Sequence, residues 1–379
     1  MPISSPQSNG MWSPASARSA SKTLSASTPP PWQRVAAEAL SDPAELCRLL
    51  RLPPTLADAA RQAAGDFPLW VPRSYLSRIV PGNPRDPLLV QVLPQAEELA
   101  SVPHFQADPL GEAETARGPG LLWKYQGRIL IVTTAGCAVH CRFCFRRHFP
   151  TARLQPVADA LGTVPVFVRR KRDCPLPAPG WSPAPGWEPA LRLAAAEPSI
   201  EEIILSGGDP LMLPDTQLSY FAARLTEIAH VRRLRVHSRL PVMIPQRVNQ
   251  DLLGWLRGSR LTTILVIHVN HRAEIDEAVA AALGRLVDAG VPVLAQSVLL
   301  RGVNDDVQTL AELYGRLIDL RVLPYYLHQL DRVAGAAHFE VSEARGIELI
   351  EQLRTRLPGY AVPRYVRETP GQPGKTVLA

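Results

Sequence analysis

The chain reads TTAGCAVHCRFCFRRH from Thr133 to His148, directly after the mostly apolar stretch 128–132. Its three cysteines, Cys137, Cys141 and Cys144, have the spacing C-x3-C-x2-C. Cysteine thiolates are the usual protein ligands of iron–sulfur clusters. Three thiolates this close together can hold three irons of a 4Fe–4S cluster and leave the fourth iron open to a small molecule. The stretch therefore predicts an iron–sulfur site on a loop that follows a strand.

Three other accounts of these cysteines are a zinc site, a disulfide and inert buried thiols. A structural zinc site needs a fourth ligand to complete its tetrahedron. Three cysteines cannot all pair in disulfides, because three is odd. Tight cysteine clusters are more typical of metal sites than of buried core positions, so the iron–sulfur interpretation is favoured.

Length and composition are those of a globular protein of one large or a few average domains. The chain has 379 residues, of which 46% are hydrophobic, and a net charge of +6. It contains no apolar run of the ~18–20 residues that a membrane span needs, and its first 30 residues lack the apolar core of a secretory signal. Five cysteines, three of them clustered, suit a reducing compartment. We therefore expect a cytoplasmic protein without a membrane partner, and the modest charge does not require nucleic acid.

The N-terminal third divides into a tail and a helical region. Residues 1–33 are rich in Ser, Ala and Pro without Asp or Glu, which predicts a disordered tail. A transit peptide has a similar bias but usually more basic residues. Helical patterns over 42–50, 56–64 and 72–78 predict an N-terminal helical region over 34–120. Cys47, in the first pattern, is expected to be a small core residue.

From residue 121 strand and helix patterns alternate. Such alternation predicts parallel βαβ units, and near-continuous apolar strands indicate that both faces of the sheet are covered. We predict an α/β fold, a partial (βα)6 barrel over 121–335 with its chemistry at the carboxyl ends of the strands, and a C-terminal segment over 336–379. The predicted strands are 129–134, 200–206, 234–238, 262–269, 291–300 and 322–328, and the predicted helices are 215–228, 274–289 and 307–320.

An insertion is predicted over 152–188. It carries the basic run 169–172, Cys174 and a stretch rich in Pro, Gly and Trp. The basic run is compatible with a nucleic-acid contact, but a solvated peripheral loop is the favoured interpretation.

Polar residues follow the predicted strands. Gly207 and Gly208 allow the backbone to approach a ligand closely, and the adjacent Asp209 can accept from an ammonium group. Arg239 can bind a carboxylate in a bidentate pair. His268 and Gln296 are costly in buried strands unless they find partners, and a structural hydrogen bond is an open alternative for both.

Lys375 lies behind the Pro- and Gly-rich turn 370–374, near Glu368. Lysine amines form Schiff bases with pyridoxal phosphate. A lysine alone is more often simply solvated, so this interpretation depends on the rest of the chain.

The combination of motifs is more specific than any one of them. In chain order they are the cysteine loop with FRRHF (145–149), SGGDP (206–210), HSRLPV (237–242), HVNH (268–271), QSVLLRGVND (296–305), LPYYLHQLD (323–331) and PGQPGK (370–375). Together they resemble the lysine 2,3-aminomutase family of the radical S-adenosylmethionine superfamily over residues 60–379. Phe145, the stretch AAHF ending at Phe339, and Glu368 in place of Asp resemble the branch that serves β-lysylation of elongation factor P. Departures from the clostridial members are Lys124 in place of Arg and the insertion.

The resemblance implies a role for each candidate residue. Cys137, Cys141 and Cys144 would ligate the cluster, and Lys375 would hold pyridoxal phosphate. The remaining implied contacts are Gly207, Gly208, Asp209, Arg239, His268 and Gln296 for S-adenosylmethionine; Lys124, Tyr125 and Arg128 for the phosphate of pyridoxal phosphate; Arg146 for the lysine carboxylate; and Asp331 and Glu368 for its ε-ammonium group.

The implied activity is that of an isomerase that converts free L-lysine to β-lysine. The expected cofactors are a 4Fe–4S cluster, S-adenosylmethionine and pyridoxal 5′-phosphate. The expected partners are L-lysine, a reducing electron donor such as flavodoxin or ferredoxin, and, functionally, the ligase that attaches β-lysine to elongation factor P. Two alternatives stay open: a radical enzyme that modifies RNA, suggested by the basic run 169–172, and a non-catalytic iron–sulfur electron carrier, which would leave the polar strand ends unexplained.

Overall fold

The computed structural model describes residues 31–65, 67–149 and 187–379. Several predicted features lie outside the described residues: most of the tail 1–33, nearly all of the insertion 152–188, its basic run 169–172 and Cys174. Within the described ranges, no helix combines the length and the apolar character that crossing a bilayer requires.

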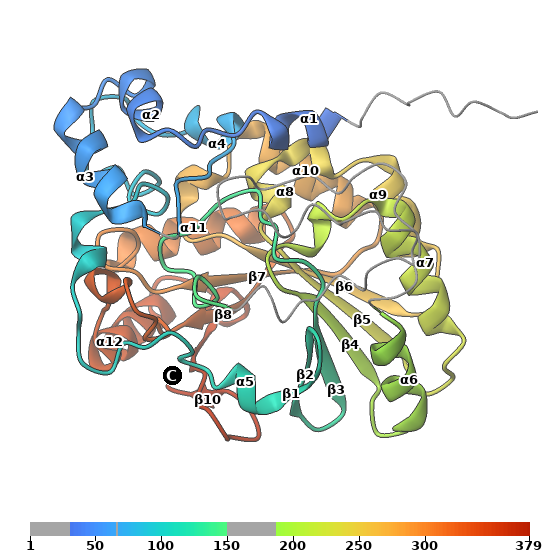
Figure 1. Ribbon diagram of the computed structural model, residues 1–379. Coiled ribbons are helices and arrows are strands. Elements are labelled where there is room, and N and C mark those ends of the chain that lie inside the picture. Colours follow the sequence, from blue (N-terminus) through green and yellow to red (C-terminus); the bar gives the residue numbers. More distant parts are fainter. Residues whose placement is uncertain (1–30, 66, 150–186) are drawn as a thin grey trace, which may run out of the picture.

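A single curved sheet forms the centre of the molecule (Figure 1). Its strand order is sequential from β1 to β10, and the strands from β3 to β9 run parallel. The outer strands β1 and β10 end the sheet on its two sides, so the predicted partial barrel is confirmed, and the six predicted strands are β3 to β8. The strands are β1 Ala116–Gly118, β2 Leu121–Tyr125, β3 Arg128–Val132, β4 Glu202–Ser206, β5 Arg233–Ser238, β6 Thr262–His268, β7 Val293–Val298, β8 Leu323–His328, β9 Arg364–Arg367 and β10 Thr376–Val377.

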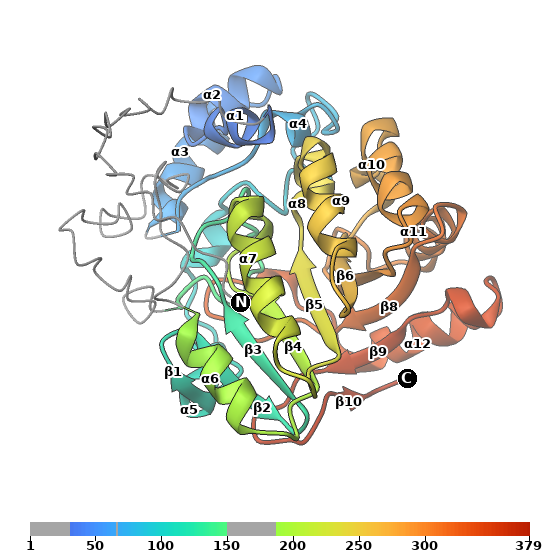
Figure 2. The same cartoon turned by 90° about the vertical axis from the view of Figure 1, so that its right-hand side faces the viewer.

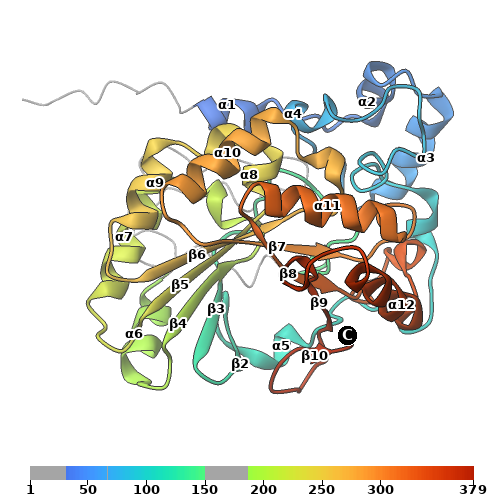
Figure 3. The same cartoon turned by 180° about the vertical axis from the view of Figure 1, so that it is seen from behind.

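Helices cover the outer face of the sheet (Figures 2 and 3). Four of them start at a side chain that caps the free backbone N–H groups of the first turn: Asn249, Asp276, Asp306 and Ser342. The covering helices are α6 Glu188–Ala196, α7 Asp215–Thr226, α9 Gln250–Arg257, α10 Glu277–Asp288, α11 Val307–Asp319 and α12 Glu343–Arg354. Helix α11 shows how these helices pack on the sheet, because its buried side chains recur at helical spacing and form one apolar face: Leu310, Leu313, Tyr314 and Leu317.

The inner face of the sheet differs from the expectation of strands buried on both faces. Burial alternates along β5 and β7, with every second residue only partly buried. The strand register aligns Leu130, Ile204, Arg235 and Ile264, and all four line a central cavity. The inward positions therefore hold polar residues as well as apolar ones, because they face a cavity and not a packed core.

The N-terminal helices gather at one end of the molecule, while α5 and β10 lie together at the opposite end (Figures 1 and 3). Helix α1 begins at Pro31, inside the predicted tail, because Trp32 is buried with the Arg247 guanidinium 4.7 Å above its ring. Cys47 is buried in the core, as expected. The remaining helices are α1 Pro31–Ala37, α2 Pro43–Leu49, α3 Pro54–Ala64, α4 Arg73–Leu76, α5 Glu112–Thr115 and α8 Leu240–Met243, with 3-10 turns η1 Ala96–Leu99, η4 Pro210–Met212, η5 Pro245–Arg247, η6 Arg272–Glu274, η7 Ala337–Phe339 and η8 Gly359–Ala361.

The sheet continues across the predicted boundary at 335/336, since β9 and β10 extend it. The division into an N-terminal region, a barrel and a C-terminal segment stays a prediction.

The N-terminal region holds the cysteine loop through buried charges. Glu98 accepts hydrogen bonds from Arg142 Nε at 2.8 Å and Nη2 at 2.6 Å, and from Arg147 Nη2 at 2.7 Å. All three side chains are nearly or fully buried. Two backbone bonds add to this, from His140 N to Trp70 O and from Arg142 N to Gln91 O, each 2.9 Å. The loop is therefore fixed from outside the barrel.

We expect Glu98→Gln to destabilise the fold strongly. Removing one partner of a buried ion pair typically costs about 3–5 kcal/mol, because the remaining charge is left without compensation, and Glu98 serves two arginines. Urea unfolding of the variant measures the loss. The neighbouring Glu97 is exposed, so Glu97→Gln is the matched control and should change stability by less than about 0.5 kcal/mol. Equal stability of the two variants would contradict this account of the loop.

Candidate active site

A cavity of about 690 Å³ lies inside the partial barrel. Its walls come from the strand ends, the cysteine loop and the C-terminal turn, and its size is within the usual range for small-molecule sites. Every site residue predicted from the sequence lines it: Lys124, Tyr125, Arg128, Cys137, Cys141, Cys144, Arg146, Gly207, Gly208, Asp209, Arg239, His268, Gln296, Asp331, Glu368 and Lys375.

The cysteine loop forms one wall of this cavity. Arg239 Nη1 donates to Cys141 Sγ at 2.7 Å, and burial raises the pKa of the Cys144 thiol to about 11. As the side chains stand, no three His, Cys, Asp or Glu residues in the described ranges are grouped to hold a metal ion. The assignment of the cysteines to a cluster therefore rests on their spacing and on their place in the cavity wall.

The glycine turn after β4 packs against the cysteine loop. A Cβ at Gly208 would lie 2.3 Å from Gly136 O, and one at Gly207, whose φ is +122°, would lie 2.7 Å from Thr134 O. Gly208 N donates to Thr134 O at 2.7 Å. The glycines are thus required by the close approach of two backbone segments, whatever ligand they also contact.

Asp209 connects the ends of β4 and β5. Its carboxylate accepts from Leu211 N, Ser238 Oγ, Arg239 N and Leu240 N, at distances from 2.7 to 3.1 Å. Burial raises its pKa despite these donors. This carboxylate therefore has a structural role that sequence reasoning did not find, and a contact to S-adenosylmethionine stays a prediction.

His268 and Gln296 are paired neighbours on β6 and β7. His268 Nε2 lies 3.1 Å from Asn270 Oδ1, so the structural hydrogen bond left open for His268 is present. Burial, followed by the charge of Arg239, lowers the pKa of His268 to about 4, which keeps its imidazole neutral.

Elsewhere in the cavity wall Glu368 contacts three of the predicted residues. Its carboxylate binds Lys375 Nζ, Tyr125 Oη and, at 3.0 Å, Lys124 Nζ. Although burial alone would raise it, the two lysine cations lower the pKa of Glu368 to about 2. Arg128 stacks on the Tyr125 ring at 4.6 Å.

Asp331 is the contrasting carboxylate. It lines the same part of the cavity, and among the residues that the structure describes it forms no ion pair. Burial raises its pKa to about 7, and the nearby Lys375 opposes this only partly. Its carboxyl group therefore changes protonation near neutral pH.

Arg146 already holds a carboxylate in this structure. Glu112 on α5 accepts from Arg146 Nε at 2.9 Å and from Nη2 at 2.6 Å, and Nη1 donates to Ser206 Oγ at 3.0 Å. Glu112 thus fixes the direction of the guanidinium. Glu112 belongs to none of the sequence motifs, so sequence reasoning did not find it.

Two further histidines face the cavity and were quoted in the sequence motifs without a role. The side chains of His237 and His328 are partly buried, and their buried Nε2 atoms have no hydrogen-bond partner among the described residues. Burial lowers the pKa of both well below the usual range, so they are neutral. Buried polar atoms without partners are rare in proteins, which marks this part of the cavity as a polar binding site.

The fold and the cavity are those of a radical enzyme of the S-adenosylmethionine type. The model of the radical SAM superfamily matches residues 131–314. L-lysine 2,3-aminomutase of Escherichia coli is 43% identical over 357 residues, which are 94% of this chain and 96% of that protein. The enzyme of the same name from Haemophilus influenzae is 40% identical, covering 92% and 95% of the two chains, and that of Clostridium subterminale is 35% identical, covering 88% and 74%.

The chain therefore belongs to the lysine 2,3-aminomutase family, an isomerase family within the radical SAM superfamily. Membership implies a 4Fe–4S cluster, S-adenosylmethionine and pyridoxal phosphate as cofactors. The prediction of family, enzyme class and cofactors is confirmed at this level, while the roles of individual residues stay predictions.

The raised pKa of Asp331 predicts a pH-dependent cost to stability. The unfolded carboxyl ionises near 3.8 and the folded one near 7, so between these values the folded state holds a proton that the unfolded state has lost. Stability then falls as pH rises through this window and levels off above it. Asp331→Asn should therefore be more stable than wild type by up to about 4 kcal/mol at pH 8, since one pKa unit corresponds to about 1.4 kcal/mol.

Unfolding of both proteins at pH 5, 6, 7 and 8 measures this difference, which should grow with pH. The variant Asp319→Asn, at an exposed position of α11, is the control for the substitution itself. A difference that stays constant or shrinks with rising pH would show that Asp331 is ionised throughout.

Proposed function

We propose that this enzyme converts free L-lysine to β-lysine. The observation that carries the proposal is the single cavity that joins the two predicted sets of residues. The three cysteines, the glycine turn and Arg239 line one part, and Lys375, Glu368, Asp331 and Arg146 line another. A non-catalytic electron carrier would not require Lys375, Glu368, Asp331 and Arg146 in the cavity. A radical enzyme that modifies RNA would not require a lysine that binds pyridoxal phosphate.

The residues present fit the three cofactors. Cys137, Cys141 and Cys144 would hold the cluster, and Arg239, whose buried Nε has no partner in the described ranges, fits the carboxylate of S-adenosylmethionine. Gly207, Gly208, Asp209, His268 and Gln296 would complete that part.

Pyridoxal phosphate fits the other part of the cavity. Lys375 would bind its aldehyde carbon, and Lys124, Tyr125 and Arg128 would take its phosphate, because cations and donors favour an anion. The unpartnered Nε2 atoms of His237 and His328 are available to its polar groups.

When bound, the cluster with S-adenosylmethionine would supply a carbon radical that abstracts hydrogen, and pyridoxal phosphate would supply an aldehyde carbon that bonds the migrating nitrogen and a ring that delocalises the unpaired electron. The chain's own residues position the substrate and exclude water. Arg146, aimed by Glu112, would bind the lysine carboxylate through its Nη1 edge. Asp331 and Glu368 would bind the ε-ammonium group, since a buried ammonium is costly unless it is paired. Asp331 would release its proton to form that pair.

The two histidines near Lys375 would contribute hydrogen bonds without a positive charge. His237 and His328 lie where the fields of Lys375 and other cations disfavour a further positive charge. They can therefore donate or accept hydrogen bonds near Lys375 without adding a competing cation beside the substrate's ammonium group.

The biological setting is part of the proposal. The chain covers 96% and 95% of the Escherichia coli and Haemophilus influenzae relatives, which supports the branch that serves β-lysylation of elongation factor P. In that branch we infer that β-lysine is supplied to a ligase that modifies elongation factor P. The electron donor, such as flavodoxin or ferredoxin, and the cytoplasmic location stay predictions.

Anaerobically purified enzyme with S-adenosylmethionine, pyridoxal phosphate and a reductant should convert L-lysine to β-lysine. Cys141→Ala should bind no intact cluster and show no turnover, because one of three thiolate ligands is lost. Cys47→Ala, at a buried position far from the cavity wall, is the control and should keep both. Full iron content in Cys141→Ala would contradict the cluster assignment.

Borohydride reduction of the enzyme with pyridoxal phosphate should attach the pyridoxyl group to Lys375, which peptide mapping can locate. Lys375→Arg keeps the charge opposite Glu368 but should take up no label, since a guanidinium forms no such bond. A label on Lys124 instead would reverse the roles of the two lysines. Absence of bound pyridoxal phosphate would favour the alternative of an RNA-modifying enzyme.

A further inference from the structure

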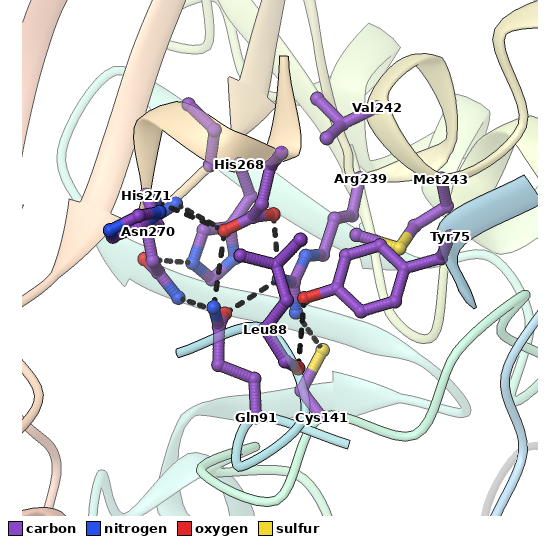
Figure 4. Close-up of polar contacts among 12 residues, drawn as sticks. Tyr75, Leu88, Gln91, Cys141, Arg239, Val242, Met243, His268, Asn270 and His271 are labelled. Atoms are coloured by element: carbon purple, nitrogen blue, oxygen red, sulfur yellow. Dashed lines mark hydrogen bonds and ion pairs between the residues drawn. The ribbon is translucent and has the colours of Figure 1, made fainter. Parts of the chain in front are cut away.

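The guanidinium of Arg239 is held on one side only (Figure 4). Its Nη2 donates to Gln91 Oε1 at 2.8 Å and to Glu274 Oε2 at 2.9 Å. Its Nη1 donates to Cys141 Sγ at 2.7 Å. Its Nε is buried without a partner among the described residues. Two acceptors thus share one nitrogen, while the other two nitrogens are left to the thiol and the cavity.

Glu274 is itself held rigidly. It is fully buried, and its Oε1 accepts from Asn270 N at 2.9 Å, His271 N at 3.1 Å and Gln91 Nε2 at 3.3 Å. Backbone and side-chain donors, together with the charge of Arg239, lower its pKa although burial raises it. Glu274 is therefore a fixed carboxylate that cannot follow Arg239 if the guanidinium turns.

Gln91 joins this network to the cysteine loop. Its backbone oxygen accepts from Arg142 N at 2.9 Å, one residue after Cys141, while its side-chain Oε1 accepts from Arg239 and from Asn270 Nδ2. Its Nε2 also donates to Pro87 O at 2.9 Å. One residue therefore sets both the position of the loop and the position of the arginine beside it.

A purely structural ion pair would be expected to satisfy the guanidinium as fully as possible, because a buried donor without a partner is costly. Arg142 shows this alternative in the same protein, with Nε and Nη2 on Glu98 and Nη1 on Phe67 O. Arg239 leaves its Nε without a partner in the described ranges, as Arg147 also does, but of these three arginines Arg239 is the one that lines the cavity. Its place in the cavity wall together with the unused Nε indicates an arginine available to a ligand.

We propose that Glu274 and Gln91 are positioning residues, which hold Arg239 by one nitrogen so that the rest of its guanidinium faces Cys141 and the carboxylate of S-adenosylmethionine. The inference rests on the proposed function and adds to it two residues with no contact to the reacting atoms. It predicts that one buried negative charge beside Arg239 Nη2 is required, and that either of the two positions can supply it.

The test uses anaerobically reconstituted enzyme and measures iron content, affinity for S-adenosylmethionine without lysine, and the midpoint potential of the cluster. Glu274→Gln should keep its iron but bind S-adenosylmethionine about tenfold more weakly or worse, because Arg239 loses the charged partner that orients it. Its cluster potential should rise, since a buried negative charge near the cluster has been removed.

The double variant Gln91→Glu with Glu274→Gln moves the carboxylate to the other acceptor of the same nitrogen. It should recover most of the lost affinity and shift the potential back. Glu277→Gln, exposed on α10 three residues away, should match wild type in every measurement. Wild-type affinity and potential in a folded Glu274→Gln, or no recovery in the folded double variant, would overturn the proposal.

If Glu274→Gln does not fold, Gln91→Met provides an independent test. It keeps the Arg239–Glu274 charge pair and removes only the neutral acceptor, so affinity for S-adenosylmethionine should fall severalfold at unchanged iron content. Unchanged affinity would overturn the proposal. Failure of the wild-type enzyme itself to bind iron or S-adenosylmethionine would instead contradict the proposed function, so the two failures are distinguishable.

Discussion

A buried charge must be paired, and this constraint organises the interior of the protein. Four buried or nearly buried glutamates each hold a cation beside the cavity or the cysteine loop. Glu98 holds Arg142 and Arg147, and the other three pairs are Glu112 with Arg146, Glu274 with Arg239 and Glu368 with Lys375 and Lys124. None of these glutamates lies on a strand of the sheet. The barrel strands thus form much of the cavity wall, while glutamates on the segments outside the strands orient the arginine and lysine side chains.

Asp331 stands apart from this pattern. Among the described residues its carboxyl group has neither an ion pair nor a hydrogen-bond donor, whereas Asp209, the other cavity carboxylate without an ion pair, accepts four hydrogen bonds. Burial raises the pKa of Asp331 to about 7. The other cavity carboxylates are satisfied by cations or by hydrogen-bond donors, so Asp331 is the one in the described ranges that is free to pair with a cation from a ligand. The ε-ammonium group of lysine has the charge that this position needs, which is why we place the far end of the substrate there.

The sequence predicted the fold, and it predicted residues that the structure places in the wall of one cavity, because both depend on local patterns. The strands from β3 to β8 follow from apolar runs, and the candidate residues follow from motifs at strand ends. The partners of these residues could not be predicted. Glu112, Glu274 and Gln91 pair with residues distant in the chain, and only the folded backbone brings them together. Asp209 is a further example, because three of its four donors lie at the end of β5 and directly after it, and only the folded sheet brings them beside the end of β4.

Helix α1 begins at Pro31, three residues before the expected start of the helical region, for a related reason. Trp32 belongs to a stretch with the composition of a tail, yet it is buried against Arg247. The burial of this one aromatic side chain places residues in a helix although the composition around them predicted a disordered tail. Sequence reasoning therefore located chemistry more reliably than it located the supports of that chemistry.

The central claim is that Asp331 and Glu368 select the substrate by its ε-ammonium group, and turnover of lysine by Asp331→Ala and Glu368→Ala tests it most directly. The loss of a partner of a buried charge corresponds to about two to four decades in rate or affinity. Each variant should lose at least about a hundredfold in β-lysine formation while still cleaving S-adenosylmethionine without coupling to product. Turnover within about tenfold of wild type in both variants would contradict lysine as the substrate.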